Sequence, residues 1–80
     1  MSIEWTEVQV RADWPRTWEA RGTGAGDLWW YTIELQSDRY VTYRGHRPGQ
    51  TDNRACQGQF ADLESAKQAA VDSDRFWNRT

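Results

Sequence analysis

Six tryptophans in a chain of 80 residues are the feature that most restricts what this sequence can fold into. A domain of this length buries only about 60% of the surface that its unfolded chain exposes, so its core is thin. Small domains commonly compensate with disulfides or a structural metal. This chain offers one cysteine, Cys56, and one histidine, His46, so we expect no disulfide, metal site or cofactor. Bulky aromatic side chains must therefore supply the buried area.

The single cysteine also favours a reducing compartment, where disulfides do not persist. Residues 1–5 carry neither the basic nor the apolar region of a signal peptide, and no apolar run is long enough to cross a membrane. We therefore expect one cytoplasmic domain, residues 1–80. The net charge of −2 argues against a general nucleic-acid binder, because neutralisation of phosphates dominates that kind of affinity.

Alternation of apolar and polar residues predicts strands over residues 6–12, 17–21, 28–36 and 39–44. Ser37 and Asp38, between the last two strands, are typical of a tight hairpin turn. In this hairpin we assign the more apolar side chains to the core face and the others to an open face. The core face then carries Trp29, Tyr31, Ile33, Leu35, Val41 and Tyr43, and the open face carries Trp30, Thr32, Tyr40, Thr42 and Arg44.

A helix is predicted after Asp62, which is a good N-cap with Glu64 in the first turn. Residues 45–58 are rich in turn formers and predict a long loop, with a short strand near residues 55–60. We therefore expect an α+β fold, with a three- to four-stranded antiparallel sheet and one C-terminal helix packed on one face. The apolar positions of the helix are Leu63, Ala66, Ala70 and Trp77.

Motifs that would indicate catalysis are weak. The glycines of residues 22–26 lack the spacing of a phosphate-binding loop and are better explained as a hairpin loop. His46 and Cys56 lack an identifiable third residue that would orient them, so we expect a solvent-facing histidine and a partly buried thiol. Glu19 and Glu34 on adjacent strands would need a cleft to act as an acid and base pair. We expect this protein not to be an enzyme.

The open face of the hairpin is the stronger functional candidate. Aromatic and arginine side chains are enriched at protein-interface hot spots, and they also stack on single-stranded bases. A structural alternative is that some of these rings pack under the loop of residues 45–58 as a second small core. These readings stay open at this point. The candidate partner-binding residues are Trp30, Tyr40 and Arg44 on the sheet and His46, Arg47 and Arg54 in the adjacent loop.

The remaining tryptophans are divided by the same pattern. Trp29 and Trp77 are best explained as core residues, whereas Trp5, Trp14 and Trp18 stay unassigned. Six tryptophans exceed what one face of a small sheet can bury, so we expect at least one to be exposed. A large exposed apolar patch usually marks an interaction site.

Strands rich in Trp and Tyr, followed by Gly58-x-Phe60 and the alanine-rich helix of residues 62–70, resemble short phage- and prophage-encoded proteins. Anti-CRISPR proteins are among them. The resemblance implies a non-enzymatic inhibitor that occupies a surface of a host defence complex and blocks its nucleic-acid binding. The acidic helix, with Asp62, Glu64, Asp72 and Asp74, would meet a basic channel. The alternative is a small single-stranded nucleic-acid-binding module that uses the aromatic and arginine sheet face.

Overall fold

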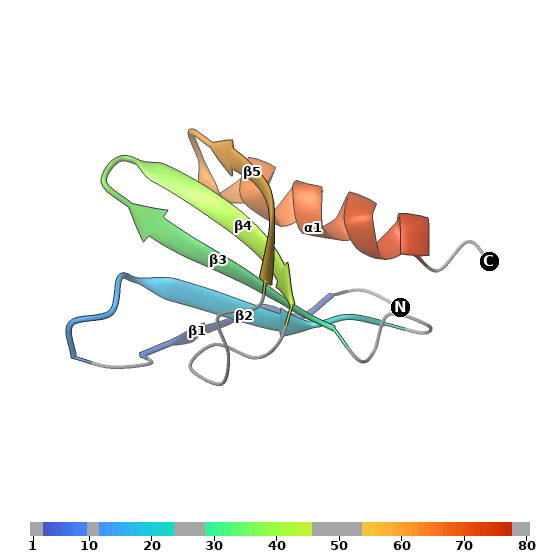
Figure 1. Cartoon of the computed structure of the whole chain (residues 1–80), viewed down its shortest axis with the longest axis horizontal. Coiled ribbons are helices and arrows are strands. Elements are labelled where there is room, and N and C mark those ends of the chain that lie inside the picture. Colours follow the sequence, from blue (N-terminus) through green and yellow to red (C-terminus); the bar gives the residue numbers. More distant parts are fainter. Residues whose placement is uncertain (1–2, 10–11, 24–28, 46–53, 78–80) are drawn as a thin grey trace.

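The computed structural model describes residues 3–9, 12–23, 29–45 and 54–77, which form five strands and one helix (Figure 1). Each strand pairs antiparallel with the next along the chain, so the sheet order is β1-β2-β3-β4-β5. The expected α+β class is confirmed, with five strands in place of three to four because residues 17–21 and 54–60 both join the sheet. The elements are β1 (Thr6–Val8), β2 (Thr17–Arg21), β3 (Trp30–Gln36), β4 (Arg39–Gly45), β5 (Arg54–Phe60) and α1 (Leu63–Trp77).

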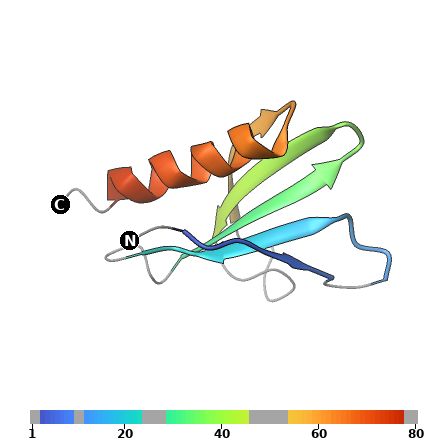
Figure 2. The same cartoon turned by 180° about the vertical axis from the view of Figure 1, so that it is seen from behind.

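Helix α1 follows β5 directly and lies across one face of the sheet, over β4 and β5 and the edge of β3 (Figures 1 and 2). Its start is fixed by Asp62, as expected, because the Asp62 carboxylate accepts a 2.8 Å hydrogen bond from the Ser65 backbone N–H. Ala66 and Ala70 are fully buried beneath the helix. Their small side chains let the helix backbone approach the sheet closely.

The hairpin of β3 and β4 turns through Ser37 and Asp38, as predicted, with Gln36 paired to Arg39. Ser37 has a positive φ of 58°, a conformation that two-residue hairpin turns require. Because the turn has two residues, odd-numbered residues of β3 lie opposite even-numbered residues of β4. Ile33 is therefore paired with Thr42.

This pairing corrects the predicted faces of β4. The core face of β3 was predicted correctly, but Tyr40, Thr42 and Arg44 share that face, and Val41 and Tyr43 lie on the opposite one. The Thr42 hydroxyl is fully buried and donates a 2.9 Å hydrogen bond to the Ala66 carbonyl of α1. A polar residue can occupy this core position because its hydroxyl has a partner there.

The core between sheet and helix is built around Trp18, Ile33 and Ala66. The Trp18 and Tyr40 rings lie with their centroids 5.7 Å apart at a tilted angle, which is favourable for aromatic pairs. Trp18, which the sequence left unassigned, is thus a core residue. The half-buried side chains packed against this cluster are Trp5, Leu35, Tyr40, Phe60 and Leu63.

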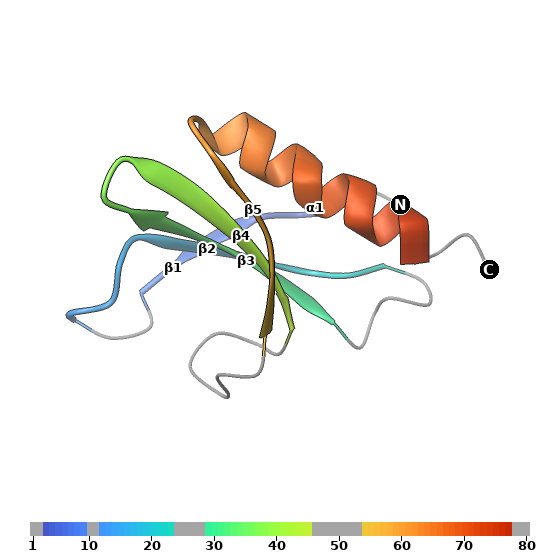
Figure 3. The same ribbon diagram turned by 45° about the horizontal axis from the view of Figure 1, so that its top comes forward.

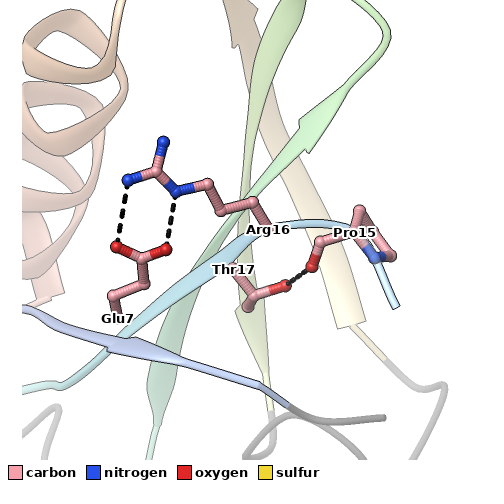
Figure 4. A network of polar contacts seen from close by, with 4 residues as sticks. All are labelled: Glu7, Pro15, Arg16 and Thr17. Carbon is pink, nitrogen blue, oxygen red and sulfur yellow. Dashed lines mark hydrogen bonds and ion pairs between the residues drawn. The ribbon is translucent and has the colours of Figure 1, made fainter. Parts of the chain in front are cut away.

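Arg16 covers the part of this core that α1 does not reach, above β1 and β2. Its guanidinium lies 5.0 Å from the centre of the Trp18 ring and forms a two-pronged ion pair with Glu7 of β1, with N···O distances of 2.6 and 3.2 Å (Figure 4). The hydrogen bond from Arg16 lowers the pKa of Glu7. Both groups are exposed, so the main effect of the pair is to hold the arginine over the tryptophan.

Strand β5 contains a bulge where its pairing with β4 shifts between Thr42 and Tyr43. Gly58 lies opposite Thr42 and has a φ of 144°, a conformation that side chains rarely adopt. A Cβ atom at this position would lie 2.8 Å from the Cζ atom of Phe60. Glycine is therefore required here both by the backbone and by the ring that covers it.

We expect Gly58→Ala to lower the free energy of unfolding by about 2–3 kcal/mol, because it adds backbone strain to a steric overlap with Phe60. Urea denaturation of both proteins measures the difference. Gln59→Ala is the matched control, because Gln59 is the exposed next residue of the same strand. Equal stability of the two variants would show that the bulge relaxes without cost.

Candidate functional site

The structure separates the sheet residues that were predicted to form one binding surface. Trp30 lies on the face opposite α1, whereas Tyr40 and Arg44 lie on the face that α1 covers. Arg54 is the first residue of β5 and pairs with Gly45, which in turn pairs with Trp30. Arg54 and Trp30 therefore lie at the same level of the sheet, two strands apart, whereas Trp30 lies on the opposite face from Tyr40 and Arg44. His46 and Arg47 lie outside the described residues.

Two large apolar side chains are exposed in the part of the chain that the structure describes: Trp29, with 37% of its surface exposed, and Phe76, with 60%. The position of Trp29 is a correction, because the sequence predicted it in the core. Trp77 is the last residue of α1, and its side chain lies outside the described part of the structure.

Trp29 is joined to one of the predicted site residues. The Arg44 guanidinium lies 5.0 Å from the centre of the Trp29 ring, within the range of a cation–π interaction. Phe76 lies one helical turn beyond Ser73, whose hydroxyl receives a hydrogen bond from Tyr31, the cross-strand partner of Arg44. We call Trp29, Arg44 and Phe76 the aromatic surface. It lies at the end of the domain where α1 ends.

Three contacts fix the geometry at this end of the domain. The Asp74 carboxylate accepts hydrogen bonds from the backbone N–H of Thr23, at 3.0 Å, and from the Thr23 hydroxyl. The N–H of Gly22 donates to the Trp29 carbonyl at 2.9 Å, which closes the base of the β2–β3 hairpin. The Tyr31 hydroxyl lies 3.4 Å from that of Ser73. The helix end is thereby tied to β3 and to the segment that follows β2.

Burial raises the pKa of the Tyr31 hydroxyl above its ordinary value of 10.0, and the negative charge of Asp74 adds to this effect. Hydrogen bonding to Ser73 and the positive charge of Arg44 act in the opposite direction.

A raised tyrosine pKa makes folding favour the protonated form. The corresponding stability is present below pH 10 and is lost as the pH rises above 10, because the unfolded chain then releases its proton first. We expect the free energy of unfolding to fall more steeply above pH 10 in the native protein than in Tyr31→Phe. The difference between the tyrosinate absorbance titrations of the two proteins should have its midpoint above 10.0. A midpoint at or below that value would contradict this account.

Trp30 lines a shallow groove of about 640 Å³ on the face opposite α1. The groove combines acidic, basic and hydroxyl side chains with the indole ring, so it is polar and of mixed charge. Glu19 lines the groove, but Glu34 does not, and the Glu34 carboxylate accepts a 2.9 Å hydrogen bond from Gln36. The lining residues are Glu4, Thr6, Glu19, Ala20, Arg21, Thr23 and Trp30.

The four acidic residues predicted to give the helix its negative surface differ in exposure. The carboxylates of Asp62, Glu64 and Asp72 are exposed, whereas Asp74 is 5% exposed. The expectation that all four carboxylates could meet a basic partner is therefore corrected for Asp74. Figure 3 shows the length of α1 lying along β4 and β5.

Cys56 lies on β5 and is exposed, not partly buried as expected. Within the described ranges, no group of three or more His, Cys, Asp or Glu residues is arranged to hold a metal ion. The one helix described is too short and too polar to cross a membrane.

The chain was compared with models of protein families, with curated proteins and with solved structures. None of these comparisons found a match, so the proposal for its function rests on the aromatic surface and the charges around it.

Proposed function

We propose that this protein is a non-enzymatic binding domain, and that the aromatic surface is where a partner protein binds. The observation that carries the proposal is the Arg44 guanidinium stacked on a Trp29 ring that is still 37% exposed. Tryptophan and arginine are the residues most enriched among interface hot spots. A ring already held in place also loses little conformational freedom when a partner covers it.

The class of partner that we propose is a host defence complex that binds nucleic acid, in line with the resemblance to anti-CRISPR proteins. The exposed carboxylates of Asp62, Glu64 and Asp72 support this choice. They repel phosphates, but they complement the basic channel in which such a complex holds its nucleic acid. A binding domain of this kind inhibits by occupying the channel or its rim.

Affinity capture from the lysate of the native host tests the proposal, with and without nuclease treatment. The tagged protein is compared with Phe76→Asp, which places a charge on the aromatic surface at a 60% exposed position. We expect a protein partner that survives nuclease and is absent from the variant capture. Recovery of nucleic acid that disappears with nuclease and weakens steeply with salt would favour the single-stranded nucleic-acid module instead.

A further inference from the structure

Asp74 differs from the other carboxylates of the helix segment. The side chains of Asp62, Glu64 and Asp72 are exposed, whereas Asp74 is 5% exposed and lies against the start of the β2–β3 loop. Burying a carboxylate is unfavourable unless it is hydrogen-bonded. Both oxygens of Asp74 are bonded to Thr23, one by the backbone N–H at 3.0 Å and the other by the hydroxyl. These are charge-assisted bonds, which are stronger than bonds between neutral groups.

The contact between Thr23 and Asp74 joins segments 51 residues apart. Two series of contacts connect these segments to Trp29. In the first series, Thr23 follows Gly22, whose N–H donates a hydrogen bond to the Trp29 carbonyl at 2.9 Å. The position of the Trp29 backbone therefore depends on the loop base that Asp74 holds.

The second series of contacts starts from Ser73, the residue before Asp74 in α1. Ser73 receives a hydrogen bond from Tyr31, and Tyr31 is the cross-strand partner of Arg44, whose guanidinium covers the Trp29 ring. The charges of Asp74 and Arg44 act in opposite directions on the pKa of the Tyr31 hydroxyl. Both the backbone and the side chain of Trp29 are thus tied to the end of α1.

We propose that Asp74 and Thr23 form a latch that controls the aromatic surface. When the latch is closed, Trp29 and Phe76 are held in one arrangement, and the partner binds a preorganised site. When the latch is open, Thr23 separates from Asp74 of α1, and binding must first restore the arrangement. The effect on affinity rests on the proposed function, whereas the latch itself can be measured in the isolated protein.

Amide hydrogen exchange in the isolated protein tests the latch directly. In Asp74→Ala, we expect the Gly22 amide to exchange about ten- to a hundredfold faster, because charge-assisted hydrogen bonds to the loop are lost. The Ile33 amide in the middle of the sheet should change less. Thr23→Val removes the hydroxyl alone and keeps the backbone bond, so it should give a smaller effect and remains informative if Asp74→Ala does not fold. Asp72→Ala is the matched control, because it removes the same charge from an exposed position of the same helix.

A second readout reports on Trp29 itself. Because the Arg44 guanidinium lies 5.0 Å from the centre of the Trp29 ring, the ring current should displace the NMR signal of the Arg44 Nε–H proton. We expect this signal to move towards its random-coil position in Asp74→Ala and not in Asp72→Ala. Affinity for the captured partner should fall about tenfold in Asp74→Ala, in parallel with these changes.

Three results would overturn parts of this account, each in its own way. If Gly22 exchange and the Arg44 signal respond equally in Asp74→Ala and Asp72→Ala, there is no latch. If they respond to Asp74→Ala alone while partner affinity is unchanged, the latch exists but does not control binding. If the native protein captures no partner while the latch responds as expected, the proposed function is wrong and the structural coupling of Asp74 to Trp29 stands.

Discussion

Replacing Ile33 with alanine is expected to lower the free energy of unfolding by about 3–4 kcal/mol. Ile33 is fully buried at the centre of the sheet, between Trp18 and Ala66. The loss combines the transfer of the removed methyl and methylene groups with the cavity that they leave. A chain of this length has a total stability of about 4–12 kcal/mol, so the variant is expected to be largely unfolded at 37 °C if the native value is near the lower limit.

Urea denaturation followed by tryptophan fluorescence measures this loss. Ile33→Val is the graded control and should lose about 1 kcal/mol, because it removes one methylene and leaves a small cavity. Leu35→Ala, at a half-buried position of the same strand, should lie between the two. A loss of less than about 1 kcal/mol for Ile33→Ala would mean that the core is centred elsewhere.

The fold class could be predicted from the sequence because its signals are local. Asp62 caps the helix whatever the sheet does, and the spacing of Ala66 and Ala70 defines its buried side. The tight turn at Ser37 and Asp38 could likewise be read from residue types. The number of strands was harder to predict, because β1 has only three residues and β5 contains a bulge that interrupts its alternation.

The error in the faces of β4 was avoidable. A two-residue turn places Leu35 opposite Tyr40, and this geometry alone fixes Thr42 and Arg44 on the helix side. The apolar character of the side chains predicted the opposite assignment, because Val41 and Tyr43 are more apolar than Thr42 and Arg44. The buried hydroxyl of Thr42 is accommodated by the Ala66 carbonyl, a partner that residue types do not reveal. Turn geometry is the stronger constraint when it conflicts with apolar character.

The aromatic surface could be predicted only in part. The sequence pointed to Arg44 and to a tryptophan at the start of the same hairpin, but it chose Trp30, which lies on the other face, in place of Trp29. Whether Trp29 is covered depends on where α1 ends, and that is a property of the assembled domain. Asp72 and Asp74 are equally acidic in sequence, and only the fold brings one of them to Thr23.

Replacing Trp29 with alanine is expected to weaken binding of the partner about thirtyfold or more, the loss that defines an interface hot spot. The unfolding free energy should fall by less than in Ile33→Ala, because 37% of Trp29 is already exposed to solvent whereas Ile33 is fully buried. Titration calorimetry with the purified partner measures the first quantity, and urea denaturation measures the second.

Trp30→Ala is the control that makes this prediction specific to one face. It removes the same side chain from the next residue, which lines the groove on the side of the sheet opposite α1. If the aromatic surface binds the partner, Trp30→Ala leaves the affinity within about threefold of the native value, since the change is outside the contact. If Trp30→Ala is the variant that loses binding, the partner docks on the groove face. The Trp29 ring lies against Arg44 on the helix side and Trp30 lines the groove on the other side, so this pair of substitutions assigns the binding face without a structure of the complex.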